Sequence, residues 1–200
     1  MINIIVLETS ACIEYALNVT TQSHGKYIHI KSDHNRKLTR FVPVCGERWH
    51  TSTIEREANH SIQKAVNELV DERLNRRKGT YIIRKNLRNK AKENLKELFE
   101  SSVLKNPGTI DLQQIVLFYE NINQTQVGRL DELRLRKRVD NILPEPNDLR
   151  ILAEVVELAK LDDIGLISGD AHFTEFKDEI SDEFGINILD YYDLIKFIPN

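Results

Sequence analysis

The sequence INIIVLE at residues 2–8 places a short apolar run directly before an acid, Glu8. A second run, IGLI at residues 164–167, comes shortly before another acid, Asp170. Continuous apolar runs of this length are typical of strands buried in a parallel sheet. The carboxyl ends of parallel strands lie at one edge of the sheet, where functional sites collect. We therefore expect Glu8 and Asp170 to face each other at that edge.

Two carboxylates that are brought together repel each other unless a cation lies between them, and a hard divalent metal ion with oxygen ligands is the usual cation. Glu57 is a third candidate, because it falls on the helical stripe of Ile54 that we expect to face the core, where a charge needs a partner. Asp148 follows Pro146 at a helix start and is a fourth. Each acid also has an ordinary alternative: a solvated strand end, a turn or a helix cap.

The composition indicates one soluble domain spanning residues 1–200, since the chain has 200 residues, 40% hydrophobic content and 30% charged content. The net charge of −3 excludes a polyanion binder by bulk charge alone. Residues 73–96 nevertheless carry ten Lys or Arg and one acid. Two cysteines, Cys12 and Cys45, give neither a disulfide framework nor a zinc spacing. Without an evident signal peptide or membrane-spanning run, we expect a cytoplasmic protein.

Hydrophobic periodicity and turn residues predict strands at both ends of the chain and helices between them. The expected strands are 2–7, 165–168 and 186–189, and residues 18–44 form a hairpin or a long loop. Thr9 or Ser10, Ser52, Thr109 and Asp148 are the expected starts or caps of helices, and Gly79 is an expected helix end. The predicted helices are 11–17, 52–79, 83–99, 112–122, 128–141, 148–159 and 173–183. The pattern is that of an α/β sheet with a helical insertion at about residues 60–145.

Taken together, four segments resemble the PIN-domain ribonuclease family. The segments are IIVLETS at residues 4–10, HTSTIERE at 50–57, NDLRILA at 147–153 and LISGDAHF at 166–173, and GINIL at 185–189 resembles the closing strand. The match covers about residues 2–20, 48–60 and 146–195. In two respects the chain departs from the family pattern: Glu8 stands where the family usually has Asp, and the helical insertion is not part of the minimal fold.

The resemblance implies a three-layer sandwich around a central, mainly parallel sheet, and a metal-dependent endoribonuclease that hydrolyses RNA. It implies Mg²⁺ or Mn²⁺ held by Glu8, Asp148 and Asp170, with Glu57 as a ligand directly or through water. Ser10 and Ser168 would orient the carboxylates. His172 is a weaker candidate for moving protons or touching phosphate.

Several alternatives remain open at this stage. A basic stripe formed by Arg84, Lys85, Arg88 and Lys92 is either an RNA contact or an ordinary solvated helix face. The chain is either an active nuclease, a non-catalytic PIN-like module that binds RNA or a protein partner, or the toxin nuclease of a toxin–antitoxin pair. A homodimer, an antitoxin or another protein partner is compatible with each.

Overall fold

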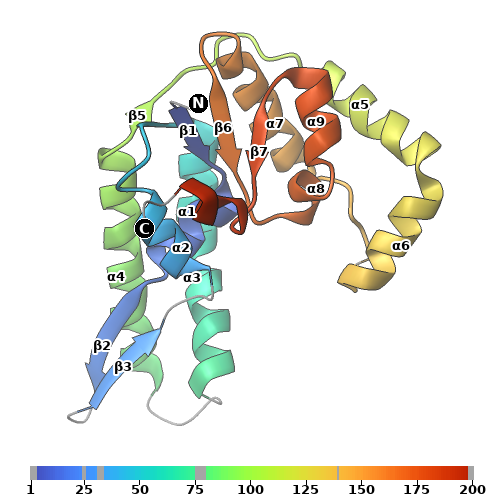
Figure 1. Ribbon diagram of the computed structural model, residues 1–200. Helices are drawn as coiled ribbons and strands as arrows, with labels where there is room; N and C mark the ends of the chain where they lie inside the picture. The colour runs from blue at the N-terminus through green and yellow to red at the C-terminus, as the bar shows by residue number, and fades with distance from the viewer. Residues whose placement is uncertain (1–3, 24–25, 31–33, 75–79, 139, 198–200) are drawn as a thin grey trace.

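A five-stranded parallel sheet forms the centre of the computed structural model, which describes residues 4–23, 26–30, 34–74, 80–138 and 140–197 (Figure 1). The strand order is β5-β4-β1-β6-β7. The strands are β1 (Ile4–Leu7), β4 (Glu47–His50), β5 (Val103–Leu104), β6 (Ile164–Ile167) and β7 (Asn187–Leu189). The chain is therefore an α/β protein, and the arrangement is compatible with the three-layer sandwich that we predicted.

The two decisive apolar runs form neighbouring central strands, β1 and β6, in which every described residue is buried. They pair in register from Ile4 opposite Ile164 to Leu7 opposite Ile167. Glu8 N–H continues the ladder by donating to Ile167 O at 2.9 Å. The register therefore brings Glu8 and the residues after β6 to the same level at one edge of the sheet.

The sequence did not predict β4 and β5. β4 has the sequence ERWH, in which the first half is exposed or half-buried and only the last two residues are buried. β5 has two residues, both exposed. Neither segment carries an apolar run, so each becomes a strand only because a neighbouring strand supplies hydrogen-bond partners. β5 also lies inside the segment 60–145 and pairs with β4, so that segment is not purely helical.

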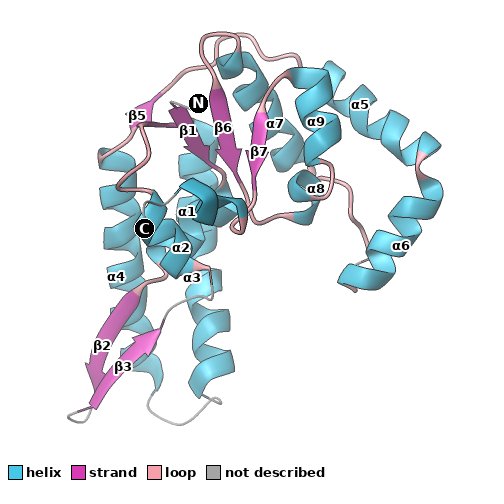
Figure 2. Ribbon diagram, viewed as in Figure 1, coloured by secondary structure: helices cyan, strands magenta, loops and turns pink. Residues whose placement is uncertain are grey.

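Helices occupy most of the remaining chain, as the periodicity predicted (Figure 2). They are α1 (Thr9–Ala16), α2 (Asn35–Phe41), α3 (Ser52–Leu74), α4 (Thr80–Glu100), α5 (Leu112–Thr125), α6 (Val127–Lys137), α7 (Pro146–Ala159), α8 (Ala171–Thr174) and α9 (Lys177–Phe184), with a 3-10 helix η1 (Asp193–Phe197). The predicted helix at 173–183 is divided into α8 and α9. Residues 18–44 contain the hairpin β2 (Val19–Ser23) and β3 (Lys26–Ile30) and also α2, which was not predicted.

The starts of four helices differ from the sequence prediction. α7 begins at Pro146 with Glu145 as its cap, so Asp148 lies in its first turn and does not open it. The other three differ by one or two residues. Glu8 rather than Thr9 or Ser10 caps α1, by accepting the Ser10 N–H. Thr51 rather than Ser52 precedes α3, and its hydroxyl accepts the Ile54 N–H at 3.4 Å. Asp111 rather than Thr109 caps α5. Several neighbouring residues can cap a helix equally well, so the tertiary packing selects the one used. The helix end predicted at Gly79 lies outside the described residues.

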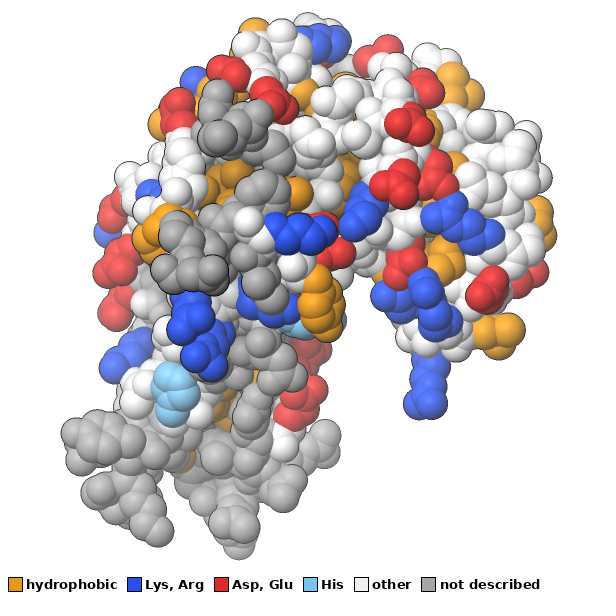
Figure 3. All heavy atoms as spheres, viewed as in Figure 1, with side chains coloured by type: hydrophobic (Ala, Val, Ile, Leu, Met, Phe, Trp, Pro, Cys, Tyr) orange, Lys and Arg blue, Asp and Glu red, His pale blue; other side chains and the backbone are white. Residues whose placement is uncertain are grey.

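The helices extend from the sheet in two directions (Figure 1). α3 and α4 form a long pair, with the β2–β3 hairpin beside its far end, whereas α5 and α6 form an arm on the other side. The surface between the arm and the pair is deeply hollowed (Figure 3). Among the helices that the structure describes, none is both long enough and apolar enough to cross a membrane.

Candidate functional site

Glu8 is the buried centre of the site, with 1% of its surface exposed. It follows β1 and caps α1, so both its backbone and its side chain are fixed. Its Oε2 accepts three hydrogen bonds: from Ser10 N at 2.9 Å, from Ser10 Oγ at 2.5 Å and from Ser168 Oγ at 3.2 Å. Among the described residues, no donor reaches the other oxygen, Oε1. The two serines therefore hold the Oε2 side of the carboxylate in place.

The pKa of Glu8 is raised well above its ordinary value. Burial is the main cause, because a carboxylate that is removed from water is stabilised less in its charged form. The negative charge of Asp170 raises the pKa further, the hydrogen bonds from Ser10 lower it, and the charge of Asp148 adds a smaller increase. Glu8 therefore lies within the electrostatic reach of two other predicted acids.

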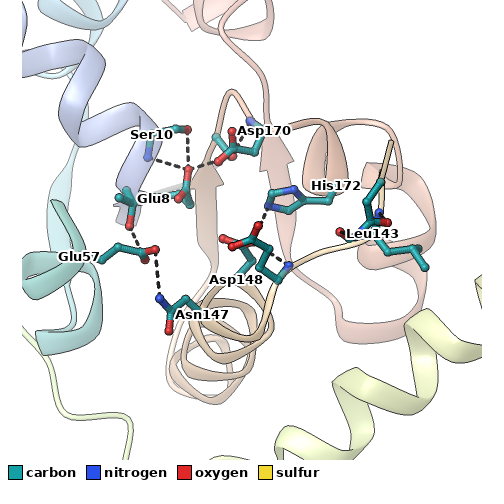
Figure 4. Close-up of polar contacts among 12 residues, drawn as sticks. Glu8, Ser10, Glu57, Leu143, Asn147, Asp148, Asp170 and His172 are labelled. Atoms are coloured by element: carbon teal, nitrogen blue, oxygen red, sulfur yellow. Dashed lines mark hydrogen bonds and ion pairs between the residues drawn. The ribbon is translucent and has the colours of Figure 1, made fainter. Parts of the chain in front are cut away.

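Asp170 comes from the turn between β6 and α8, at the same sheet edge as Glu8. Its backbone N–H donates to Ser168 Oγ at 3.0 Å, while the same hydroxyl donates to Glu8. Its backbone carbonyl accepts the N–H groups of Phe173 and Thr174 at the start of α8. These bonds hold the backbone of Asp170, and Figure 4 shows Asp170 beside Glu8.

Glu57 reaches the site from α3, where its side chain is half-buried. Its Oε2 accepts a hydrogen bond from Thr9 Oγ1 at 3.0 Å, and its Oε1 accepts one from Asn147 Nδ2 at 3.4 Å. The sequence placed Glu57 on the stripe facing the core. In the structure, it lies where that stripe meets the starts of α1 and α7.

A buried carboxylate, Glu154, holds α3 and α7 together beside Glu57. It accepts hydrogen bonds from Thr51 Oγ1 at 2.5 Å and from Thr53 Oγ1 at 2.6 Å, both from the start of α3. Glu154 itself belongs to α7, and Arg150 on the same helix pairs with it at 3.1 Å. This tie fixes the distance between the helices that carry Glu57 and Asp148.

Asp148 is the third residue of α7 and has both a structural and a site contact. Its Oδ2 accepts the Glu145 N–H at 2.9 Å and lies 3.4 Å from His172 Nε2. Asp148 therefore stabilises the start of α7, as the sequence allowed, and it also lies beside His172 in the site. His172 belongs to α8, whose backbone is held by Tyr119: the Tyr119 hydroxyl donates to His172 O at 2.7 Å.

The four predicted acids therefore converge on one space between α1, α3, α7 and α8 (Figure 4). All their side-chain donors are carboxylate oxygens, which suit Mg²⁺ or Mn²⁺. Burial is the main cause of the raised pKa of Glu8, and a cation would relieve the further part that comes from the charges of Asp170 and Asp148. In donor type and charge the residues fit a divalent ion. Within the described ranges, however, no three His, Cys, Asp or Glu side chains are grouped at metal-ligand spacing.

The basic stripe on α4 is less uniform than its sequence suggested. Arg84 is half-buried and forms an ion pair with Asp71 of α3, so it is not a freely solvated cation. Lys85 and Lys92 are exposed, and Arg88 is half-buried. α4 lies on the outer side of α3, away from α7 and α8 (Figure 1). The stripe is therefore separated from the acids by a helix.

Sequence reasoning missed Tyr191, which forms a wall of the site. Its hydroxyl lies 3.5 Å from Ser10 Oγ, and its ring covers Gly169 so closely that a Cβ added there would lie 2.5 Å from Tyr191 Cε2. Burial raises the pKa of Tyr191 far above its ordinary value, so the phenol stays protonated. A tyrosine two residues after a strand gives no signal in the sequence, because only the fold brings it to Gly169.

Comparison with known protein-family models and with curated proteins finds no match for this chain.

Proposed function

We propose that the protein is a metal-dependent, PIN-like endoribonuclease that hydrolyses RNA phosphodiester bonds at the Glu8 site. One observation carries the proposal: Glu57, Asp148 and Asp170 lie around the buried carboxylate of Glu8, whose pKa is raised mainly by burial and further by the charges of Asp170 and Asp148. A group of acids that destabilise one another has little value as packing. It is typical of a site that takes up a cation, and strongly perturbed carboxylates in clefts mark functional sites.

In this mechanism the four acids would be metal ligands, and the hydroxyl groups beside them would hold these acids in position. Glu8, Asp148 and Asp170 would hold Mg²⁺ or Mn²⁺, and Glu57 would hold it directly or through water. The ion, when bound, would activate a water molecule and stabilise negative charge on the phosphate. Ser10 and Ser168 fix Glu8 through Oε2, so that Oε1 remains the oxygen available to a ligand. Thr9 holds Glu57 in the same way.

One observation favours a non-catalytic module as the second candidate. Glu8 caps α1 and accepts three hydrogen bonds, and both roles stabilise the fold without any ligand. The longer side chain of Glu8, in the place where the family usually has Asp, would then mark a site that binds RNA or a protein partner without cutting RNA.

A cleavage assay separates these two candidates. Labelled RNA would be incubated with the protein in Mg²⁺, in Mn²⁺ and in EDTA, and the protein compared with Asp170→Asn. The matched control is Asp182→Asn, because Asp182 is an exposed acid on α9. We expect cleavage that depends on the metal ion. Asp170→Asn should reduce the cleavage rate by at least about a hundredfold, which corresponds to an increase of about 2.7 kcal/mol in the activation free energy. Asp182→Asn should leave the rate unchanged.

Two results would contradict the proposal. Cleavage that persists in EDTA would exclude the metal mechanism. RNA binding without cleavage, equal in the unmodified protein and in Asp170→Asn, would favour the binding module.

A further inference from the structure

A cavity of about 510 Å³ opens directly beside the carboxylates. Ser10, Gly169 and Asp170 form the wall that it shares with the Glu8 site. The lining also includes three aromatic rings, those of His34, Tyr191 and Tyr192, of which Tyr191 packs against Gly169. A ligand whose reacting group lies at Asp170 would therefore extend its neighbouring group toward these rings.

The three rings form a continuous cluster. The His34 and Tyr191 ring centroids are 4.8 Å apart with the planes tilted by 32°, and the His34 and Tyr192 centroids are 6.1 Å apart, edge to face. Lys37 Nζ lies 3.6 Å from the centroid of the Tyr192 ring. Tyr192 as a residue is nevertheless 69% exposed, and Lys37 covers one face of its ring. An exposed aromatic ring that is held by neighbouring rings is suited to stacking.

The backbone holds the two tyrosines in fixed and different directions. Asp190 Oδ1 accepts the N–H groups of Tyr192 at 2.7 Å and of Asp193 at 2.9 Å, which closes a turn directly after β7. The turn directs Tyr191 inward onto Gly169 and leaves Tyr192 at the cavity mouth. Tyr192 is therefore positioned in advance, which lowers the entropic cost of stacking a ligand on it.

Charge indicates which part of a nucleotide the cavity would accept. Its lining includes the acids Glu14, Asp170 and Asp190, of which Asp190 pairs with Lys177 at 3.6 Å, and one lysine, Lys137, which pairs with Glu175 at 2.7 Å. Such a lining disfavours a phosphate deep in the cavity, because acids and phosphate repel each other. A neutral base, which has a flat π-face and N–H donors, meets no such penalty.

We propose that this cavity is a subsite for one unpaired nucleobase, which stacks on Tyr192 while its adjoining phosphate lies at the Glu8 site. The proposal rests on the ribonuclease function proposed above for the choice of RNA as the ligand. It adds a requirement for the RNA substrate. The nucleotide beside the scissile phosphate must be unstacked from its neighbours, since a paired base cannot enter the cavity.

Fluorescence of 2-aminopurine tests the subsite without requiring cleavage. The probe is a set of short single-stranded RNA oligonucleotides, each with 2-aminopurine at one position, bound to the protein with Ca²⁺, which takes carboxylate oxygen ligands and lets the phosphate approach the acids. Stacking on an aromatic ring would quench the fluorescence at one position. We expect Tyr192→Ala to abolish this quenching and to weaken binding by about tenfold, within the range measured for loss of one stacked base. Tyr192→Phe, which keeps the ring, should retain both.

Tyr81→Ala is the matched control, because Tyr81 is a 71% exposed tyrosine at the start of α4. Three results would overturn the subsite. They are no quenching with the unmodified protein, quenching that persists in Tyr192→Ala, and an equal loss of quenching in Tyr81→Ala. The two proposals fail separately. Tyr192-dependent quenching in a protein that cuts no RNA would support the subsite and refute the nuclease. Metal-dependent cleavage with quenching unchanged in Tyr192→Ala would refute the subsite alone.

Discussion

Burial and then the charge of Asp170 raise the pKa of Glu8, although the two acids come from opposite ends of the chain. They meet because β1 and β6 are parallel neighbours whose carboxyl ends lie at one sheet edge. Ser168 connects them: its hydroxyl donates to Glu8 Oε2 and accepts the Asp170 N–H. The fold thus holds two like charges close together, which opposes folding whenever both are ionised and unpaired.

Replacing Glu8 with Gln should stabilise the metal-free protein at about pH 7.5. Since the folded-state pKa of Glu8 is raised, the folded protein binds this proton more tightly than the unfolded chain does. Stability from Glu8 is therefore fully present below its ordinary pKa of 4.5 and is lost as the pH rises through the raised value. Glu8→Gln should remove this loss, and each kcal/mol regained should raise Tm by about 2–4 °C.

Thermal unfolding in EDTA, followed across a pH series, checks this prediction. The gain from Glu8→Gln should grow as the pH rises above the ordinary pKa of Glu8 and should shrink as the pH falls toward it. A variant that is less stable than the unmodified protein at every pH would show that the hydrogen bonds to Glu8 outweigh its buried charge.

Divalent ions should raise Tm, because an ion that binds the folded site stabilises it by mass action. At a concentration about 100 times Kd the gain is about 2.7 kcal/mol. Titration with Mg²⁺ and with Mn²⁺ in a thermal shift assay should show a saturating increase that Asp170→Asn and Glu8→Gln both diminish. Asp182→Asn should respond like the unmodified protein. An equal increase in all variants would place the ion elsewhere.

Gly169→Ala should destabilise the protein by about 1–3 kcal/mol, the usual cost of overpacking, because the new Cβ would lie 2.5 Å from the Tyr191 ring. In a Tyr191→Leu background the same change should cost clearly less, since contacting residues are not additive. Chemical denaturation of the single and double variants measures this coupling.

Gly128→Ala provides the opposite control. Gly128 lies in α6 with nothing within 4 Å of an added Cβ, so alanine should stabilise the helix there by up to about 1 kcal/mol. Additive losses in the Gly169 and Tyr191 variants would show that the two residues do not contact each other in solution.

Arg84→Glu should destabilise the protein by about 1 kcal/mol or more, whereas Lys85→Glu should change stability by less than about 0.5 kcal/mol. Arg84 is paired with Asp71, so the substitution replaces an attraction with a repulsion, while Lys85 is exposed. Urea denaturation of both variants is the measurement. Equal effects would show that the Arg84–Asp71 pair contributes nothing in solution.

The Lys85→Glu variant also tests the α4 stripe as an RNA contact. If Lys85 meets a phosphate of single-stranded RNA, the slope of log affinity against log salt should fall by about 0.7. An unchanged slope would indicate an ordinary solvated face.

The sequence by itself determined the strands and helices that a pattern of nearby residues marks. The apolar runs gave β1 and β6, and helical periodicity gave most of the long helices. The acids at the two strand ends could be placed at one sheet edge because parallel strands share an edge. The sequence thus predicted that Glu8 and Asp170 would lie together.

Only the tertiary structure decided the features that depend on partners from distant parts of the chain. β4 and β5 exist because a neighbouring strand pairs with them, and Arg84 pairs with Asp71 because α3 and α4 lie side by side. The aromatic wall of Tyr191 and Tyr192 reaches Gly169 and His34 only when β7 has joined the sheet. The spacing of residues along the chain shows which of them share a face of one helix or strand. It does not show which other helix or strand that face contacts, because this depends on how the whole core packs.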